Sequence, residues 1–301
     1  MKTNLGFLFA IVTVSFWGIS FIAIKIVVEV IPPITLATIR FAISLLALLA
    51  FTSLTSKEKR LPKSAKKYSI LAGFWGITMY FIFENIGVRF TTPSQASLLI
   101  STVPIFTIAI ADLYRRKMSD FKLYIMSFLS LAGVAVIILS NGLKFNSDIL
   151  GDLLVLLAAF SWGMYTLYVD KLENYDNLLT TLEMTKWGLI FLIPFSAVEI
   201  FIESPKVVNF FRPEILLWLL FLGILCSGFG YVMWNYAIKR LGSRTSSNFI
   251  YLIPLVSIIA DSLVLKHVPS MGVYVGGALV MTGVILGERF SRTEEKFKAR
   301  D

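Results

Sequence analysis

The segment LGFLFAIVTVSFWGISFIAIKIVV, residues Leu5 to Val28, decides the class of fold. Lys25 is its single charged side chain. The hydrocarbon core of a bilayer, about 30 Å thick, is crossed by a helix of about 20 apolar residues. The segment is longer than the apolar region of a signal peptide and lacks a small-x-small cleavage site. We therefore expect it to remain in the protein as the first transmembrane helix.

Comparable apolar segments fill the rest of the chain. Hydrophobic residues make up 56% of its 301 residues and charged residues 16%, whereas a soluble domain has about 25% charged residues. The sequence therefore predicts an all-α polytopic membrane protein without a soluble domain. Ten transmembrane helices are expected near residues 5–28, 34–55, 68–88, 93–113, 121–140, 150–170, 178–200, 214–237, 245–265 and 270–288.

The basic residues predict how these helices are oriented. If the N-terminus is cytoplasmic, most of the 28 lysine and arginine residues fall in cytoplasmic segments, which is the arrangement that the positive-inside rule describes. We expect both termini in the cytoplasm and the protein in the cytoplasmic membrane. The net charge of +9 then reflects topology and contact with anionic lipids, and no nucleic-acid partner is expected. The external segments hold only Arg89, Lys144, Lys206, Arg212 and Lys266.

The chain also contains an internal repeat. Because each copy holds five helices, an odd number, the second copy enters the membrane in the opposite sense, as in many secondary transporters. We expect two inverted five-helix repeats around a central cavity, at residues 1–145 and 146–290, and a basic cytoplasmic tail at 291–301. A shift of 150 residues superposes Gly73 on Gly223, Asn85 on Asn235, Pro104 on Pro254 and Gly133 on Gly283, and a shift of 145 superposes Trp17 on Trp162.

Along the chain, in this order, lie the motifs Phe16-Trp17-Gly18, Arg40, Pro104, Gly133-Val134, Ser161-Trp162-Gly163, Pro254 and Gly283-Val284. In their order and duplication they resemble the EamA-type transporters of the drug/metabolite transporter superfamily. The resemblance implies export of a metabolite or amino acid through a central cavity lined by helices one, three, four, six, eight and nine. The family usually has Glu near the ends of helices four and nine, where this chain has Lys117 and His267.

Two cations inside the predicted helices are candidates for binding the solute. A charge at a helix centre costs about 2.5–3.5 kcal/mol, so each one requires a reason. Arg40 and Lys186 occupy equivalent positions under a shift of 146 residues. Either they offer positive charge to an anionic group of the substrate, or they form structural salt bridges, Arg40 with Glu84 or Glu29 and Lys186 with Glu183.

Glu84 is an acidic residue well inside an apolar helix, and Asn85 follows it. Asn235 in helix eight is the equivalent of Asn85. Glu84 either couples transport to protons or pairs with Arg40 or Arg89 in a purely structural role.

Aromatic and hydroxyl side chains complete the predicted site. Rings with polar edges suit a mostly apolar pocket, although the same residue types form belts at membrane interfaces and hydroxyls also tie helices together. Beside Arg40, Glu84, Asn85, Lys186 and Asn235, the residues predicted to bind the solute are Trp17, Ser20, Tyr80, Ser101, Trp162, Tyr165, Tyr231 and Tyr251.

Together these features predict a secondary transporter that moves a small metabolite, an amino acid or a related solute, out of the cell by alternating access. A lipid flippase or scramblase is the alternative, and an intramembrane enzyme is less favoured because the sequence has no His-Glu-x-x-His motif. No cofactor or metal is expected. Transport would use proton coupling, exchange or the gradient of the solute itself, in a monomer or weak homodimer.

Overall fold

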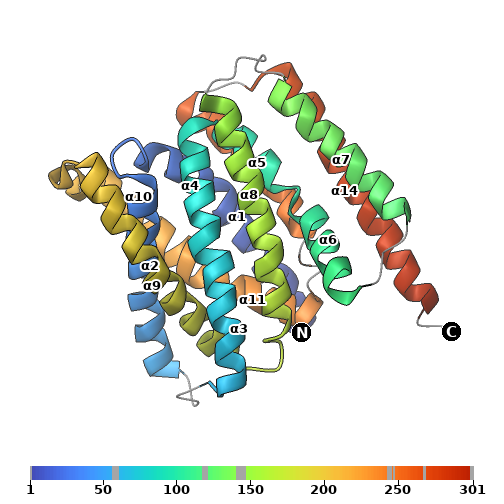
Figure 1. Cartoon of the computed structure of the whole chain (residues 1–301), viewed down its shortest axis with the longest axis horizontal. Helices are drawn as coiled ribbons and strands as arrows, with labels where there is room; N and C mark the ends of the chain where they lie inside the picture. The colour runs from blue at the N-terminus through green and yellow to red at the C-terminus, as the bar shows by residue number, and fades with distance from the viewer. Residues whose placement is uncertain are drawn as a thin grey trace.

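The computed structural model describes residues 2–55, 61–116, 121–139, 147–242, 246, 248–266 and 269–298. Within these ranges the regular structure is entirely helical, and no strand occurs (Figure 1). The prediction of an all-α protein is therefore confirmed.

The first half of the chain forms helices over all five predicted ranges. The stretch Lys63–Phe90 is one long helix with a π-helical middle, whereas a turn at Ser101 and Thr102 interrupts the next one. In chain order the elements are α1 (Lys2–Val27), α2 (Pro33–Thr55), α3 (Lys63–Gly73), η1 (Phe74–Met79), α4 (Tyr80–Phe90), α5 (Pro93–Ile100), α6 (Val103–Arg115) and α7 (Phe121–Leu139).

The second half follows the same order. A π-helical segment again lies in the middle of its third long helix, Pro213–Leu241. The elements are α8 (Ser147–Asp170), α9 (Asn177–Glu203), η2 (Val207–Phe211), α10 (Pro213–Leu220), η3 (Phe221–Phe229), α11 (Gly230–Leu241), η4 (Asn248–Tyr251), α13 (Leu252–Ala260), η5 (Asp261–Leu265) and α14 (Met271–Lys298).

The length and composition of these helices fit a membrane protein. In the part of the chain that the structure describes, seven helical segments are long and apolar enough to cross a bilayer. The other three predicted ranges are occupied by α7 and by two shorter apolar segments, Phe249–Leu265 and Met271–Gly283. The chain is therefore a polytopic membrane protein.

The two prolines that the repeat superposes lie at equivalent interruptions. Pro104 is in the first turn of α6, directly after the break that follows α5, and Pro254 is in the first turn of α13, directly after the 3-10 turn η4. Proline has no N–H to donate. The helical hydrogen bonds to the carbonyl groups of Ile100 and Ile250, four residues earlier, therefore cannot form.

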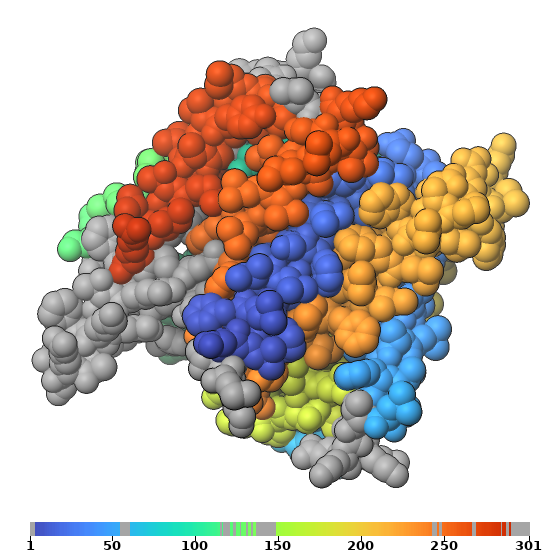
Figure 2. Space-filling view, turned by 180° about the vertical axis from the view of Figure 1, so that it is seen from behind, coloured from blue at the N-terminus to red at the C-terminus, as the bar shows by residue number. Residues whose placement is uncertain are grey.

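The halves of the chain contact each other through reciprocal pairs of helices. α4 packs on α8 and α11 packs on α1, while α6 packs on α8 and α13 packs on α1. α7 and α14 lie side by side (Figure 1). Figure 2 shows α1, in dark blue, crossing one face of the molecule between α13 and the α10–α11 segment.

Glycines permit the close approach of α7 and α14. A Cβ on Gly133 would lie 2.6 Å from the carbonyl oxygen of Gly276, and a Cβ on Gly283 would lie 2.6 Å from that of Met126. Real Cβ atoms do not come so close to backbone, so a larger residue would force the helices apart. Gly133 and Gly283, like Met126 and Gly276, are 150 residues apart, so the contact is the same in both directions.

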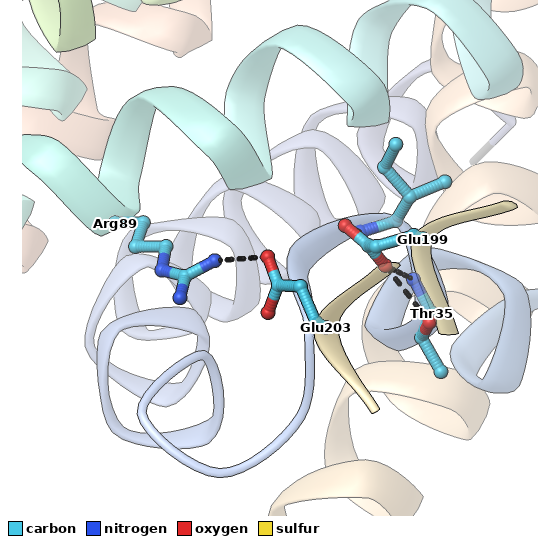
Figure 3. Close-up of polar contacts among 5 residues, drawn as sticks. Thr35, Arg89, Glu199 and Glu203 are labelled. Atoms are coloured by element: carbon cyan, nitrogen blue, oxygen red, sulfur yellow. Dashed lines mark hydrogen bonds and ion pairs between the residues drawn. The ribbon is translucent and has the colours of Figure 1, made fainter. Parts of the chain in front are cut away.

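The start of α2 is held by a carboxylate from α9 (Figure 3). Glu199 accepts hydrogen bonds from the backbone N–H groups of Ile34 and Thr35, at 2.9 and 2.6 Å, and from the hydroxyl of Thr35 at 2.8 Å. The first N–H groups of a helix have no partner within the helix, and the helix dipole favours negative charge beside them. Glu199 therefore fixes the helix that carries Arg40.

We expect Glu199→Ala to lower the free energy of unfolding by about 2 kcal/mol, because three hydrogen bonds to a charged acceptor are lost. The thermal unfolding midpoint of the purified protein in detergent measures the effect. Glu203→Ala is the matched control: Glu203 lies one turn further along α9 and pairs with Arg89 at 2.7 Å on a partly exposed surface. Its loss costs at most about 1 kcal/mol, so equal shifts in the two variants would contradict the assignment.

Candidate functional site

A cavity lies where the two halves of the chain meet. About 410 Å³ of space between its walls, counted up to the open side, is not occupied by atoms. Both halves of the chain make its walls: nine of the lining residues come from the first half and four from the second. The lining residues are Trp17, Ser20, Phe21, Arg40, Tyr80, Phe81, Glu84, Ile100, Val103, Trp162, Tyr231, Ile250 and Ile253.

The cavity brings together a part of the predicted site. Counted in the order of the ten predicted helices, its walls come from helices one, three, four, six, eight and nine, as the resemblance implied. Arg40 adds a contribution from α2. The predicted residues that line it are Trp17, Ser20, Arg40, Tyr80, Glu84, Trp162 and Tyr231.

Aliphatic lining residues were missed from the sequence, although the repeat contained a signal for them. Ile100 and Ile250 are 150 residues apart, and so are Val103 and Ile253. A search for apolar pairs at that shift beside Pro104 and Pro254 would have found both pairs.

Aromatic rings form the centre of the cavity wall. The ring centroids of Trp17 and Trp162, which the repeat superposes, are 5.2 Å apart with the planes at 83°. The ring of Tyr231 lies 5.9 Å from Trp17 and 5.7 Å from Trp162, and the ring of Tyr80 lies 5.0 Å from Trp162. Edge-to-face pairs of this kind are favourable, so these rings form a continuous aromatic wall along the cavity.

Arg40 brings a buried positive charge to the cavity, with 1% of its surface exposed. Its Nε donates to the hydroxyl of Ser227 at 2.8 Å, and its guanidinium carbon lies 4.4 Å from the ring centre of Phe81. Among the described residues, its Nη1 has no hydrogen-bond partner and its charge has no ion-pair partner. The predicted salt bridge to Glu84 or Glu29 is therefore wrong.

Glu84 brings a buried negative charge to the same cavity, with 3% of its surface exposed. Its Oε1 accepts a hydrogen bond from the hydroxyl of Tyr80 at 2.8 Å. It forms no ion pair within the described ranges, and Arg89 pairs with Glu203 instead. The predicted salt bridge of Glu84 with Arg40 or Arg89 is therefore also wrong, although Arg40 and Glu84 line the same cavity.

Lys186 does not reach the cavity, so its predicted equivalence with Arg40 is wrong. It is exposed on α9, with its ammonium 5.9 Å from the ring centre of Trp187, and no ion pair with Glu183 forms among the residues described. Successive residues of a helix differ by about 100° around its axis. The shift of 145 that superposes the two tryptophans places Arg40 on Thr185, which is fully buried.

Five other predicted residues are buried but lie outside the cavity lining. Asn85 of α4 donates to the carbonyl of Pro33, at the start of α2, at 2.9 Å. Its equivalent, Asn235 of α11, donates to Thr181, near the start of α9, at 3.0 Å. Each amide therefore connects two helices of its own half. Tyr165 donates to Asn235 at 2.6 Å. The others are Ser101, which donates to the carbonyl of Leu98, and Tyr251.

Lys117 and His267, where the family usually has Glu, lie outside the described residues. The described ranges contain no group of three or more His, Cys, Asp or Glu side chains that could hold a metal ion.

The comparison with known proteins identifies the family. The profile of the EamA-like transporter family matches residues 4–139 and again residues 149–287. The chain belongs to this family. The resemblance noted in the motifs is thereby confirmed, and the protein is a transporter that handles a small-molecule solute.

Relatives of this EamA-like protein carry transporter names. An "Uncharacterized transporter" of Archaeoglobus fulgidus is 33% identical over 277 residues, 91% of this chain and 94% of its own. "Uncharacterized transporter YdfC" of Bacillus subtilis is 28% identical over 90% of this chain and 87% of its own. A "Probable terminal-alkyne amino-acid exporter" of Streptantibioticus cattleyicolor is 29% identical over 73% of this chain and 72% of its own.

A solved structure shares the fold. It is described only as "Crystal structure of protein", has a TM-score of 0.67 and 18% sequence identity, and covers 98% of each chain. The helical arrangement is therefore one that has been observed by experiment.

Accessibility of the cavity can be measured with single cysteines. The one native cysteine, Cys226, is fully buried, so it adds little background labelling. We expect Ser20→Cys to react with a small methanethiosulfonate reagent, because Ser20 lines the cavity. Ser130→Cys is the matched control, since this buried serine lies between α7 and α14 and donates to the carbonyl of Val280. Equal labelling of the two cysteines would contradict an open cavity.

Proposed function

We propose that this protein is a secondary transporter that exports a small metabolite, an amino acid or a related solute, across the cytoplasmic membrane. Ten transmembrane helices, in inverted repeats at residues 1–145 and 146–290, would move by alternating access with both termini in the cytoplasm. One observation carries the proposal: a cavity walled by both halves, with the equivalent residues Trp17 and Trp162 in contact at its centre.

Three observations support the inverted repeat. One family profile matches the chain twice, once in each half. The contacts between the halves are reciprocal, as in α4 on α8 and α11 on α1. The π-helical segments η1 and η3 fall at equivalent places. Each half then supplies one set of walls to a shared site, as in other carriers built from inverted repeats.

Two side chains, Tyr165 and Asn235, lie between the cavity and a second cleft, and this arrangement supports the proposal of alternating access. Tyr165 packs on Trp162 with ring centroids 4.7 Å apart, and its hydroxyl bonds Asn235. Asn235 lines a second, smaller cleft together with Tyr175 and Lys239. The proposed orientation places this cleft at the cytoplasmic end. A movement that separates α8 from α11 would break the Tyr165–Asn235 bond and join the cleft to the cavity.

The chemistry of the cavity and the name of one relative support export of a small polar solute. The cavity combines aromatic walls with one cation and one carboxylate, which suits a small polar metabolite. The Streptantibioticus relative is named an amino-acid exporter. Glu84 is our candidate for proton coupling, with Tyr80, Tyr231, Cys226 and Arg40 as the titratable or charged groups around it.

One observation favours a lipid flippase or scramblase instead. A groove between α6 and α8 leaves about 540 Å³ of space not occupied by atoms, and Thr107, Thr166, Asp170 and Lys171 are among its lining residues. Such a groove could hold a lipid headgroup. Vesicles that contain the protein, assayed for labelled phospholipid and for labelled amino acids, separate the two functions: movement of lipid alone would overturn the transporter proposal.

We expect Trp162→Ala to lower the affinity for the transported solute by about tenfold, because two or more ring contacts of about 0.5–1.5 kcal/mol each are lost from the cavity wall. Uptake of labelled solute into vesicles as a function of concentration measures this. Trp218→Ala is the control, since Trp218 contacts Phe221 away from the cavity. Unchanged transport by Trp162→Ala would remove the cavity from the pathway.

We expect Glu84→Gln to make any remaining transport independent of a pH gradient, because an amide cannot carry a proton between the two sides. Vesicles with imposed inside-acid and inside-alkaline gradients provide the measurement. Glu203→Gln, which alters the partly exposed pair with Arg89, should keep the pH dependence of the wild type. Persistent pH dependence in Glu84→Gln would exclude Glu84 as the proton-coupling residue.

A further inference from the structure

Resting on the proposed function, we infer that the cavity binds a zwitterion in which a carboxylate and an ammonium group are close together. Arg40 binds the carboxylate and Glu84 binds the ammonium. The remainder of the solute is an apolar or aromatic group that lies on the rings of Trp17, Trp162 and Tyr231. The substrate class is therefore the α-amino acids with uncharged, apolar side chains.

Arg40 has hydrogen-bond donors that the described residues do not use. A guanidinium has five N–H donors, and in the described structure Arg40 uses only Nε, in its bond to Ser227. Its Nη1 is shielded from solvent and has no hydrogen-bond partner there. Leaving a buried charged donor unpaired is costly. A carboxylate is the partner whose two oxygens match the planar guanidinium.

Glu84, which lines the same cavity, has unused hydrogen-bond acceptors. A carboxylate can accept about four hydrogen bonds, and among the described residues Glu84 accepts one, from the hydroxyl of Tyr80. An ammonium group supplies three donors and a positive charge. It would also be attracted by the faces of the neighbouring aromatic rings.

The separation of the two charges selects the zwitterion. Arg40 and Glu84 line one cavity without pairing with each other, so the site offers a positive and a negative centre at once. A solute with only a carboxylate leaves Glu84 without a partner and brings a second negative charge near it. A solute with only an amine leaves Arg40 without a partner and brings a second positive charge near it. In a site with few polar groups both situations are costly.

The distribution of the polar groups orients the solute. Ser20, Arg40, Tyr80 and Glu84 all belong to the first half of the chain, whereas the second half contributes aromatic and aliphatic walls. At the positions equivalent to Glu84 and Tyr80 the second half has Trp234 and Gly230. The charged head of the amino acid therefore faces α2 and α4, and its side chain faces α8, α11 and α13, where a charged side chain would find no partner.

The test compares apolar amino acids with analogues that lack one charge. The probes are L-leucine, L-methionine and L-phenylalanine, each with its decarboxylated amine and its deaminated acid, added to the purified full-length protein in detergent. Stabilisation by a ligand reports binding to the folded state. We expect at least one amino acid to raise the unfolding midpoint and to bind roughly thirtyfold or more tightly than either of its analogues.

Two variants then assign each charge to its residue. Arg40→Gln should lose affinity for the amino acid and prefer the amine, whereas Glu84→Gln should lose affinity for the amino acid and prefer the acid. Lys186→Gln, which changes an exposed cation inside a helix, is the matched control and should keep the wild-type order. If Arg40→Gln does not fold, the ligand series on the wild-type protein still tests the inference, because it needs no variant.

The inference and the proposed function fail differently. If an amine or an acid alone binds the wild type as tightly as its amino acid, or if other solutes stabilise the protein and these amino acids do not, the zwitterion inference is overturned while Trp162→Ala still tests the cavity. If both variants keep the wild-type order of ligands, the assignment to Arg40 and Glu84 is overturned. If vesicles move labelled lipid and no soluble metabolite, the proposed function falls as well.

Discussion

The interior of a bilayer offers no hydrogen bonds, and the rest of this structure follows from that constraint. Backbone groups must be satisfied within each segment, so the regular structure of the described residues is helical. Large apolar side chains such as Phe201 and Leu113, exposed by 85% and 82%, can face outwards. Charged side chains such as Asp152, Asp261 and Arg40 are buried between helices. The polar interior of the molecule is therefore where its chemistry is concentrated.

The same constraint explains why polar side chains hold the ends of helices near the site. Lys25, the one charge in the first apolar segment, donates from its Nζ to the carbonyls of Val88, Arg89 and Thr91 at 3.0–3.1 Å. Those carbonyls lie at the C-terminus of α4, where a cation is favourable. Lys25 thus fixes the end of the helix that carries Glu84, as Glu199 fixes the start of the helix that carries Arg40.

The two halves agree in their frame and differ in their chemistry. Small residues and hydrogen bonds between helices recur at equivalent positions. Examples are the glycines between α7 and α14 and the amides of Asn85 and Asn235. Packing between helices restricts those positions strongly, because a larger side chain there separates the backbones. Side chains that face a cavity are not restricted in this way. One half could therefore have Glu84 where the other has Trp234 without loss of the shared frame.

The membrane class, the helical ranges and the shift that superposes Trp17 on Trp162 could be predicted from the sequence, because apolar length and repeated motifs are local properties of the chain. The sequence also identified Arg40 and Glu84 as charged residues inside apolar helices, where a charge is costly without a functional or structural role. The folded structure was needed to show that these two charges form no salt bridge and that Lys186 is exposed. Those outcomes depend on rotation about a helix axis, about 100° per residue, and on which helices become neighbours. A shift wrong by one residue moves a side chain from the cavity side of a helix to its surface.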